Sequence, residues 1–336
     1  MPGRLQCPEM SVKTTHIDWL NIALMLAATA AAAWLPFEVF LFSYAVLGPL
    51  HYLTEISWLH ERRYFASGKY DFLWLLLLAG GLFVVSFIIR WPTLQLALSW
   101  GAGMTYLAFM SALAMVLFNG LYPKLVFVLV AFILLLGLSR QHVYLILFAV
   151  FVPTVVHVYL FTAAFMLYGA LKSGSRPGLL AVAMLFLCGV GLLVMPVHDA
   201  YAVSRPARDN YVLFEELNRQ LLALFGMRDA DLYASGAGVA LMRFIAFAYT
   251  YHYLNWFSKT SIIRWHEVSL RRLALICLLW LAAVGVYAYD YRTGFVALYT
   301  LSFLHVYLEF PLNHQCFLGI GKELSRRWRL TPAAAH

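Results

Sequence analysis

The chain has 336 residues, of which 63% are hydrophobic and only 12% are charged, and its formal net charge is +8. Soluble domains contain about 25% charged residues, so this composition excludes an ordinary water-soluble protein and indicates an integral membrane protein. The apolar runs are long and unbroken, unlike the weak alternation of a β-barrel. We therefore predict an all-α fold, a polytopic transmembrane helical bundle.

About ten apolar runs approach or reach the roughly 20 residues that a helix needs to cross a bilayer. They cover residues 18–34, 37–59, 71–90, 95–118, 124–139, 143–171, 177–197, 234–258, 269–289 and 294–319. We expect one transmembrane domain, 18–319, between an N-terminal tail, 1–17, and a basic C-terminal tail, 320–336. The first run also fits a cleaved signal peptide, because Lys13 precedes an apolar core with small residues at its end.

The basic residues favour a retained first span. With ten spans and a cytoplasmic N-terminus, 16 of the 24 Lys and Arg residues fall on the cytoplasmic side and seven on the other side. This is the asymmetry of the positive-inside rule, so we expect both termini in the cytoplasm and the protein in a bacterial-type inner membrane. Anionic headgroups of the bilayer explain the net positive charge, and no nucleic-acid partner is expected.

The longest connection, about 198–232, is predicted on the outer side. Its stretch LFEELNRQLLALFG has leucines on one face and predicts a short interfacial helix. This helix is either a lid or a connector, and we favour a connector. The four cysteines are scattered and have neither disulfide nor metal-site spacing.

Histidines mark the even-numbered spans. His51 is in the second, His157 in the sixth, His252 in the eighth, and His305 and His314 are in the tenth. These spans run in one direction, which places all five residues in the inner half of the bilayer or near its midplane. Polar groups at that depth normally face a bundle interior or a cavity, so we expect these histidines to share one.

The spacing His-x3-Glu-x4-His occurs twice, at residues 51, 55 and 60 in GPLHYLTEISWLHERRYF and at residues 305, 309 and 314 in LHVYLEFPLNH. Residues four apart share a helix face, so the first histidine and the glutamate of each copy can act as a metal clamp. The last histidine lies on the opposite face of an ideal helix. It joins the clamp only if the helix ends, bulges or kinks, as Pro311 permits in the second copy.

The predicted metal ligands share intramembrane or near-membrane positions on these spans: His51, Glu55, His60, His157, His252, His305, Glu309 and His314. Glu55 and Glu309 are also candidate catalytic residues, as proton carriers. Such a donor set suits Fe, Zn, Cu or Mn rather than Ca or Mg, and it can hold one or two ions. The alternative is a set of histidines that only bond tyrosine and backbone partners.

Other polar residues of the spans are weaker candidates. Asn255, Asn313 and Gln315 either orient imidazoles or join helices through polar contacts. Arg243 is predicted to meet Asp290 or a polar end of a substrate.

The stretch GPLHYLTEISWLHERRYF, with the histidine-in-helix arrangement of most of the chain, resembles bacterial polytopic proteins labelled β-carotene 15,15'-monooxygenase-like, after the Brp/Blh membrane dioxygenases. The resemblance implies a helical membrane enzyme with histidine-ligated iron that cleaves a carotenoid with O2. It implies imidazole ligands at His51, His157, His252 and His305. The Pro-His-Gly start of that family is not matched here.

We therefore expect a non-haem Fe oxygenase that uses O2 on a hydrophobic, lipid- or isoprenoid-like small molecule entering from the bilayer, with an unspecified redox partner. Two other classes use the same residue types. A haem-binding membrane cytochrome would use facing histidines as axial ligands, and a metal-ion or proton transporter would use intramembrane His and Glu. A zinc hydrolase is a further variant of the metal hypothesis.

Overall fold

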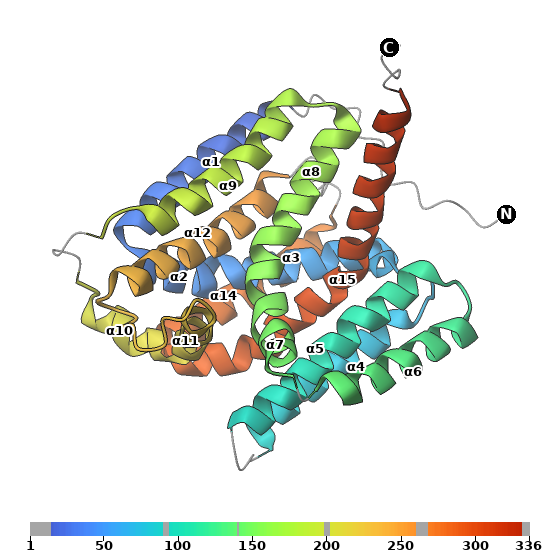
Figure 1. The fold of residues 1–336 in the computed structure, drawn as a ribbon, viewed down its shortest axis with the longest axis horizontal. Helices are drawn as coiled ribbons and strands as arrows, with labels where there is room; N and C mark the ends of the chain where they lie inside the picture. Colours follow the sequence, from blue (N-terminus) through green and yellow to red (C-terminus); the bar gives the residue numbers. More distant parts are fainter. Residues whose placement is uncertain (1–14, 90–93, 140, 198–201, 260–267, 331–336) are drawn as a thin grey trace.

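The computed structural model describes residues 15–89, 94–139, 141–197, 202–259 and 268–330. These residues form helices, and no strand occurs among them. Figure 1 shows the helices packed side by side as one bundle. The predicted all-α bundle is therefore confirmed, while most of the predicted N-terminal tail and the last six residues lie outside the described parts.

The helices occupy the ten predicted positions. Seven positions hold a single helix each: α1 (Thr15–Trp34), α5 (Leu94–Leu117), α6 (Leu121–Leu138), α9 (Arg176–Val194), α12 (Gly236–Ser258), α14 (Leu270–Tyr289) and α15 (Tyr291–Leu330). Three are composite: α2 (Pro36–Phe42), η1 (Ser43–Leu47) and α3 (Gly48–Glu61); α4 (Asp71–Phe83) and η3 (Val84–Ile88); and α7 (His142–Ile146), η4 (Leu147–Phe161) and α8 (Thr162–Ser173). The composite helices contain π-helical segments, whose wider turns change the direction of the side chains that follow.

Nine helical stretches in the described parts of the chain are long and apolar enough to cross a membrane. α12, in the eighth predicted position, is not among them. It carries Arg243, His252 and Asn255, and 17 of its 23 residues are buried by other helices. Because protein rather than lipid surrounds α12, its polar side chains do not have to face hydrocarbon.

The start of α1 and the end of α15 lie at the same end of the bundle. Ser175, between α8 and α9, donates its hydroxyl hydrogen bond to Asp18 of α1 at 2.5 Å. Arg327 of α15 donates to the Leu171 carbonyl of α8 at 2.6 Å. We call this end the terminal face. The basic segment expected as a tail continues α15 to Leu330, and its cytoplasmic location stays a prediction.

The described residues form two large apolar cores and a third, smaller one. The larger core lies mainly among α1, α2, α9 and α12, and the second mainly among α3, α4, α5 and α15. Tyr52 and Tyr253, which directly follow His51 and His252, pack in the first core. Val306, which follows His305, packs in the second core. The histidines therefore lie along the boundary between the cores.

The long connection contains α10 (Arg205–Tyr211), η5 (Val212–Phe214) and α11 (Glu215–Leu224). α11 buries Leu221 and Leu222 and packs on α12, while α10 packs on α2. The predicted helix is present, and its leucine face is directed toward the bundle.

Candidate metal centre

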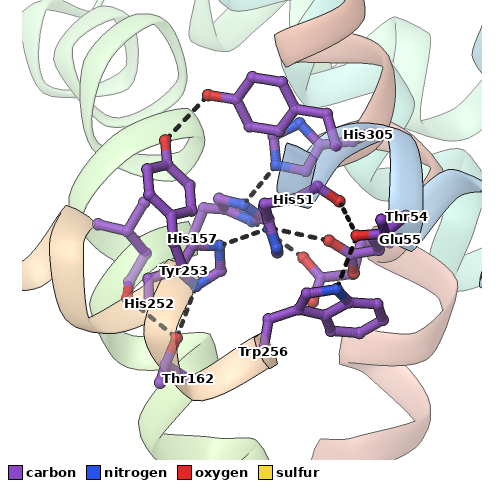
Figure 2. A network of polar contacts seen from close by, with 12 residues as sticks. His51, Thr54, Glu55, His157, Thr162, His252, Tyr253, Trp256 and His305 are labelled. Carbon is purple, nitrogen blue, oxygen red and sulfur yellow. Dashed lines mark hydrogen bonds and ion pairs between the residues drawn. The ribbon is translucent and has the colours of Figure 1, made fainter. Parts of the chain in front are cut away.

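Four histidines from four helices form a closed ring inside the bundle, which we call the four-histidine cluster (Figure 2). His51 lies on α3, His157 on η4, His252 on α12 and His305 on α15. Going around the ring from His51 through His252, His157 and His305, neighbouring ring centroids are 4.6, 4.9, 5.0 and 5.3 Å apart. None of the four residues is more than 7% exposed.

The Nε2 atoms of the four rings approach one another in pairs. His51 Nε2 lies 3.0 Å from His252 Nε2, and His157 Nε2 lies 3.1 Å from His305 Nε2. Two nitrogens about 2.1 Å from one ion, at right angles to each other, are about 3.0 Å apart. Donor atoms of His51, His252 and His305 all lie within 4.8 Å of one another. The spacing therefore fits imidazoles that share a metal ion.

Two buried carboxylates border the cluster. Glu55 Oε2 is 3.0 Å from His51 Nε2, one turn away on the same helix, which is the contact that the sequence spacing predicts. Glu309 Oε2 is 3.1 Å from Nδ1 of His157 on another helix, although the spacing paired it with His305. Neither contact has the geometry of a hydrogen bond. Both carboxylate oxygens therefore lack a hydrogen-bond partner within the described chain. The two carboxyl groups also lie close enough to interact with each other. Buried carboxylates in this state fit a nearby cation.

The tautomer of His252 suits metal binding. Its Nδ1 atom is 2.8 Å from the Thr162 hydroxyl oxygen, and that hydroxyl donates to the Val158 carbonyl at 3.0 Å. Because the hydroxyl has a single hydrogen, Nδ1 of His252 must donate the other bond. Its Nε2 atom then presents a lone pair to the cluster, as metal-bound imidazoles do.

π-helical turns position two of the histidines. η1 directly precedes α3, which carries His51, and η4 contains His157. Pro153 lies inside η4, and its missing N–H removes a backbone hydrogen bond of a regular α-helix. Regular 3.6-residue periodicity therefore does not give the direction of His157.

Aromatic residues hold the rings of the cluster. Tyr52 stacks on His305, with centroids 4.1 Å apart and planes 24° apart, and its hydroxyl is 2.9 Å from that of Tyr253. A Cβ atom at Gly48 would lie 2.9 Å from the Tyr52 hydroxyl oxygen. Because Gly48 has no side chain, Tyr52 has room to stack on His305.

A cavity of about 230 Å³ joins the cluster to the terminal face. Its inner end is formed by His51, His252, Glu55 and Glu309. Its middle is mainly apolar, and its outer end reaches the start of α1, the end of α8 and the residue after α12. Further lining residues include Trp58, Phe165, Met166 and Leu312 in the middle, and Asp18, Lys172 and Lys259 at the outer end.

Two predicted ligands lie away from the cluster. His60 is exposed, and its Nδ1 atom is 3.2 Å from the Tyr64 hydroxyl oxygen. His314 points to α5, where its Nε2 atom is 2.9 Å from the Phe109 carbonyl oxygen. α15 stays helical through Pro311, so nine residues of helix turn His314 to the face opposite His305, as the ideal geometry requires.

Two of the three weaker candidates among the amide side chains form hydrogen bonds to other segments of the bundle. Asn255 donates to Asn21 at 2.8 Å. Gln315 donates to the Phe65 carbonyl at 2.6 Å. Asn313 is buried and both polar atoms of its side chain lack a hydrogen-bond partner within the described chain.

The expected pair of Arg243 and Asp290 is not formed. Arg243 donates to the carbonyls of Met195 and Pro196 at 3.2 Å, beyond the end of α9. Asp290 accepts a hydrogen bond from the Thr293 backbone at 2.7 Å. Arg243 therefore binds carbonyl groups that follow a helix C-terminus.

Sequence reasoning missed Thr162, Lys172 and Lys259. Thr162 follows His157 by five residues, a spacing that becomes meaningful only when the π-helix of η4 is known. Lys172 and Lys259 directly follow predicted spans that carry histidines, and this position is the signal in the sequence for a cavity entrance.

No family model matches the chain, and neither the curated proteins nor the solved structures searched contain a match to it.

Proposed function

We propose that this protein is a membrane-embedded, metal-dependent oxidoreductase, a non-haem iron oxygenase that acts on a lipid- or isoprenoid-like substrate. The observation that carries the proposal is the convergence of four imidazoles and two carboxylates, from helices α3, η4, α12 and α15, at one buried point. The integral membrane character of the chain supports a hydrophobic substrate.

A cation explains the donor set better than a network of neutral polar groups does. Buried, unpaired carboxylates are strongly unfavourable, and Glu55 Oε2 and Glu309 Oε2 both lack a hydrogen-bond partner within the described chain. Nitrogen-rich sites with carboxylates bind iron, zinc, copper or manganese, and the set is large enough for one or two ions.

The residues have distinct roles in this proposal. The four-histidine cluster binds the metal, Thr162 holds the Nδ1 atom of His252, and Glu309 lies beside the Nδ1 atom of His157. Glu55 faces both the cluster and the cavity, so it can accept or deliver a proton next to a bound substrate. The apolar middle of the cavity excludes water. Bound iron would supply the one-electron chemistry that O2 activation needs.

The imidazole spacing favours a bare ion over haem. A haem held by two of these imidazoles would need room for its macrocycle between the two nitrogens. The pairs here are 3.0 and 3.1 Å apart.

Metal analysis and an ultraviolet-visible spectrum of the detergent-purified protein test the proposal. We expect one or two irons per chain, no Soret band, and loss of most of the metal in His51→Ala and His305→Ala. His60→Ala is the matched control, because His60 is exposed and away from the cluster, and it should keep the metal of the wild type.

Other outcomes identify the competing functions. Unchanged metal content in His51→Ala and His305→Ala contradicts the site. A Soret band indicates a cytochrome, and zinc as the native metal indicates a hydrolase. Flux of a metal ion or protons into proteoliposomes without O2 consumption indicates a transporter.

A further inference from the structure

The cavity changes character along its length. Its inner end meets the four-histidine cluster and two carboxyl groups, its middle is mainly apolar, and Lys172 and Lys259 lie at its outer end. We infer that the cavity takes a single-chain amphiphile, whose acidic head group binds Lys172 and Lys259 while its hydrocarbon chain reaches the cluster. This inference rests on the proposed function and names the substrate class of the same site.

The length of the cavity suits a hydrocarbon chain. Thr162, beside the cluster, and Ser173, at the terminal face, both line the cavity and are eleven residues apart on α8. At 1.5 Å per residue they are separated by about 16 Å along the helix. A substrate that bridges this distance cannot be a small polar molecule, because the intervening walls are mainly apolar.

The walls between the two ends are built from large apolar side chains. Trp58 of α3, Phe165 and Met166 of α8, and Leu312 of α15 all line the cavity. They come from three helices, so they enclose a chain from several sides. Apolar atoms of a substrate are stabilised by burial against such walls.

Both lysines are available to an anion. They are half-buried, and within the described part of the chain neither forms an ion pair. Burial lowers the pKa of Lys259 to about 8, while Glu309, Glu55 and Asp18 act in the opposite direction. An anionic head group at the outer end of the cavity would compensate the partly buried charges directly, whereas an alcohol would not.

Asp18 does not replace the anion, because its carboxylate is engaged elsewhere. It accepts the Ser175 hydroxyl hydrogen bond at 2.5 Å, and the same Ser175 oxygen accepts from Gly178 N at 3.0 Å as the N-cap of α9. The positive end of that helix stabilises the carboxylate. Asp18 therefore joins α1 to α9 and leaves Lys172 and Lys259 for a ligand.

Binding of three sixteen-carbon probes tests the inference: hexadecanoic acid, hexadecyl phosphate and 1-hexadecanol, each competing with radiolabelled hexadecanoic acid on the detergent-purified protein. We expect at least one of the two acidic probes to bind about tenfold or more tightly than the alcohol, and their order tells a carboxylate from a phosphate head group. Equal affinity of the alcohol and both acids overturns the inference.

The variants Lys172→Gln and Lys259→Gln, singly and together, should remove the preference for acids and leave the affinity for the alcohol unchanged. Lys259→Arg should keep the preference. Lys322→Gln is the matched control, because Lys322 is an exposed lysine of α15 that is not among the residues lining the cavity. The inference is overturned if the double variant still prefers the acidic probes as the wild type does, or if Lys322→Gln loses that preference to the same extent.

Metal content, measured on the same samples, separates this inference from the proposed function. It should be unchanged in all lysine variants, since neither lysine is part of the cluster. Preference for acids in a protein that binds no metal contradicts the proposed function and supports the inference. Full metal content without any preference for acids contradicts the inference alone.

Discussion

His157 Nδ1 lies 3.1 Å from Glu309 Oε2, and this contact joins η4 to α15. Glu309 is one helical turn from His305, yet its carboxylate lies beside the imidazole of the neighbouring helix. Glu55, its counterpart in the repeated spacing, instead faces the Nε2 atom of His51. In the proposed site the two glutamates would therefore have different positions: Glu55 beside an Nε2 atom that faces the metal, and Glu309 on the far side of the His157 ring.

This difference predicts unequal effects of Glu55→Gln and Glu309→Gln. We expect Glu309→Gln to weaken metal affinity by about tenfold, at the low end for outer partners of metal ligands, because the amide keeps an oxygen beside His157 Nδ1 and loses only the charge. Glu55→Gln should weaken it more, because it removes the negative charge beside His51 Nε2, which faces the proposed metal. Titration of the metal-free variants with Fe(II) measures both. Equal effects would contradict the assigned positions.

The hydroxyl of Thr162 predicts a second effect on metal binding. Thr162→Val keeps the shape of the side chain but removes the acceptor of the His252 Nδ1 hydrogen bond. We expect metal affinity to fall by about 10–100-fold. Thr162→Ser keeps the hydroxyl and should stay close to the wild type in the same titration. If valine and serine behave alike, the tautomer of His252 is not set by this residue.

Gly48 predicts a packing effect that tests the stack of Tyr52 on His305. A methyl group at Gly48 would press on the Tyr52 hydroxyl, so Gly48→Ala should lower the free energy of unfolding by about 1–3 kcal/mol. Gly80→Ala is the control, because the space around Gly80 is open within 4 Å. Thermal unfolding in detergent measures both. Adding Tyr52→Phe should recover part of the loss, and full additivity would contradict the contact.

Metal removal should destabilise the folded protein. Without a cation the carboxyl groups of Glu55 and Glu309 lie buried next to each other. A ligand at 100 times its dissociation constant stabilises a folded protein by about 2.7 kcal/mol. We therefore expect a chelator to lower Tm and Fe(II) to restore it. The same treatments should leave the Tm of a variant with both His51→Ala and His305→Ala unchanged.

Hydropathy predicts the positions of the helices well, because a membrane requires long apolar stretches whatever their tertiary contacts. The helical spacing of four residues likewise predicts the contact between His51 and Glu55. These features depend only on local sequence and on the apolar character of the bilayer interior.

The remaining part of the site depends on tertiary structure. The contact between His157 and Glu309 requires the crossing of η4 with α15, and the direction of His157 depends on a π-helix that hydrophobic periodicity does not reveal. The prediction that Pro311 bends the helix and brings His314 to the cluster is wrong. His314 instead lies where an ideal helix places it, on the face opposite His305. The polar side chains of α12 are tolerated because other helices enclose it, and this enclosure is a feature of the tertiary structure.

The enclosure of α12 also has a consequence for assembly. A helix with Arg243, His252 and Asn255 among its buried residues is a poor partner for lipid on its own, because each of these groups is unfavourable in hydrocarbon. Its place becomes favourable when α1, α2, α9 and η4 surround it. Since α12 contributes one of the four imidazoles, the four-histidine cluster is complete only in the fully assembled bundle, and in the proposed function a partly inserted chain would lack the whole site.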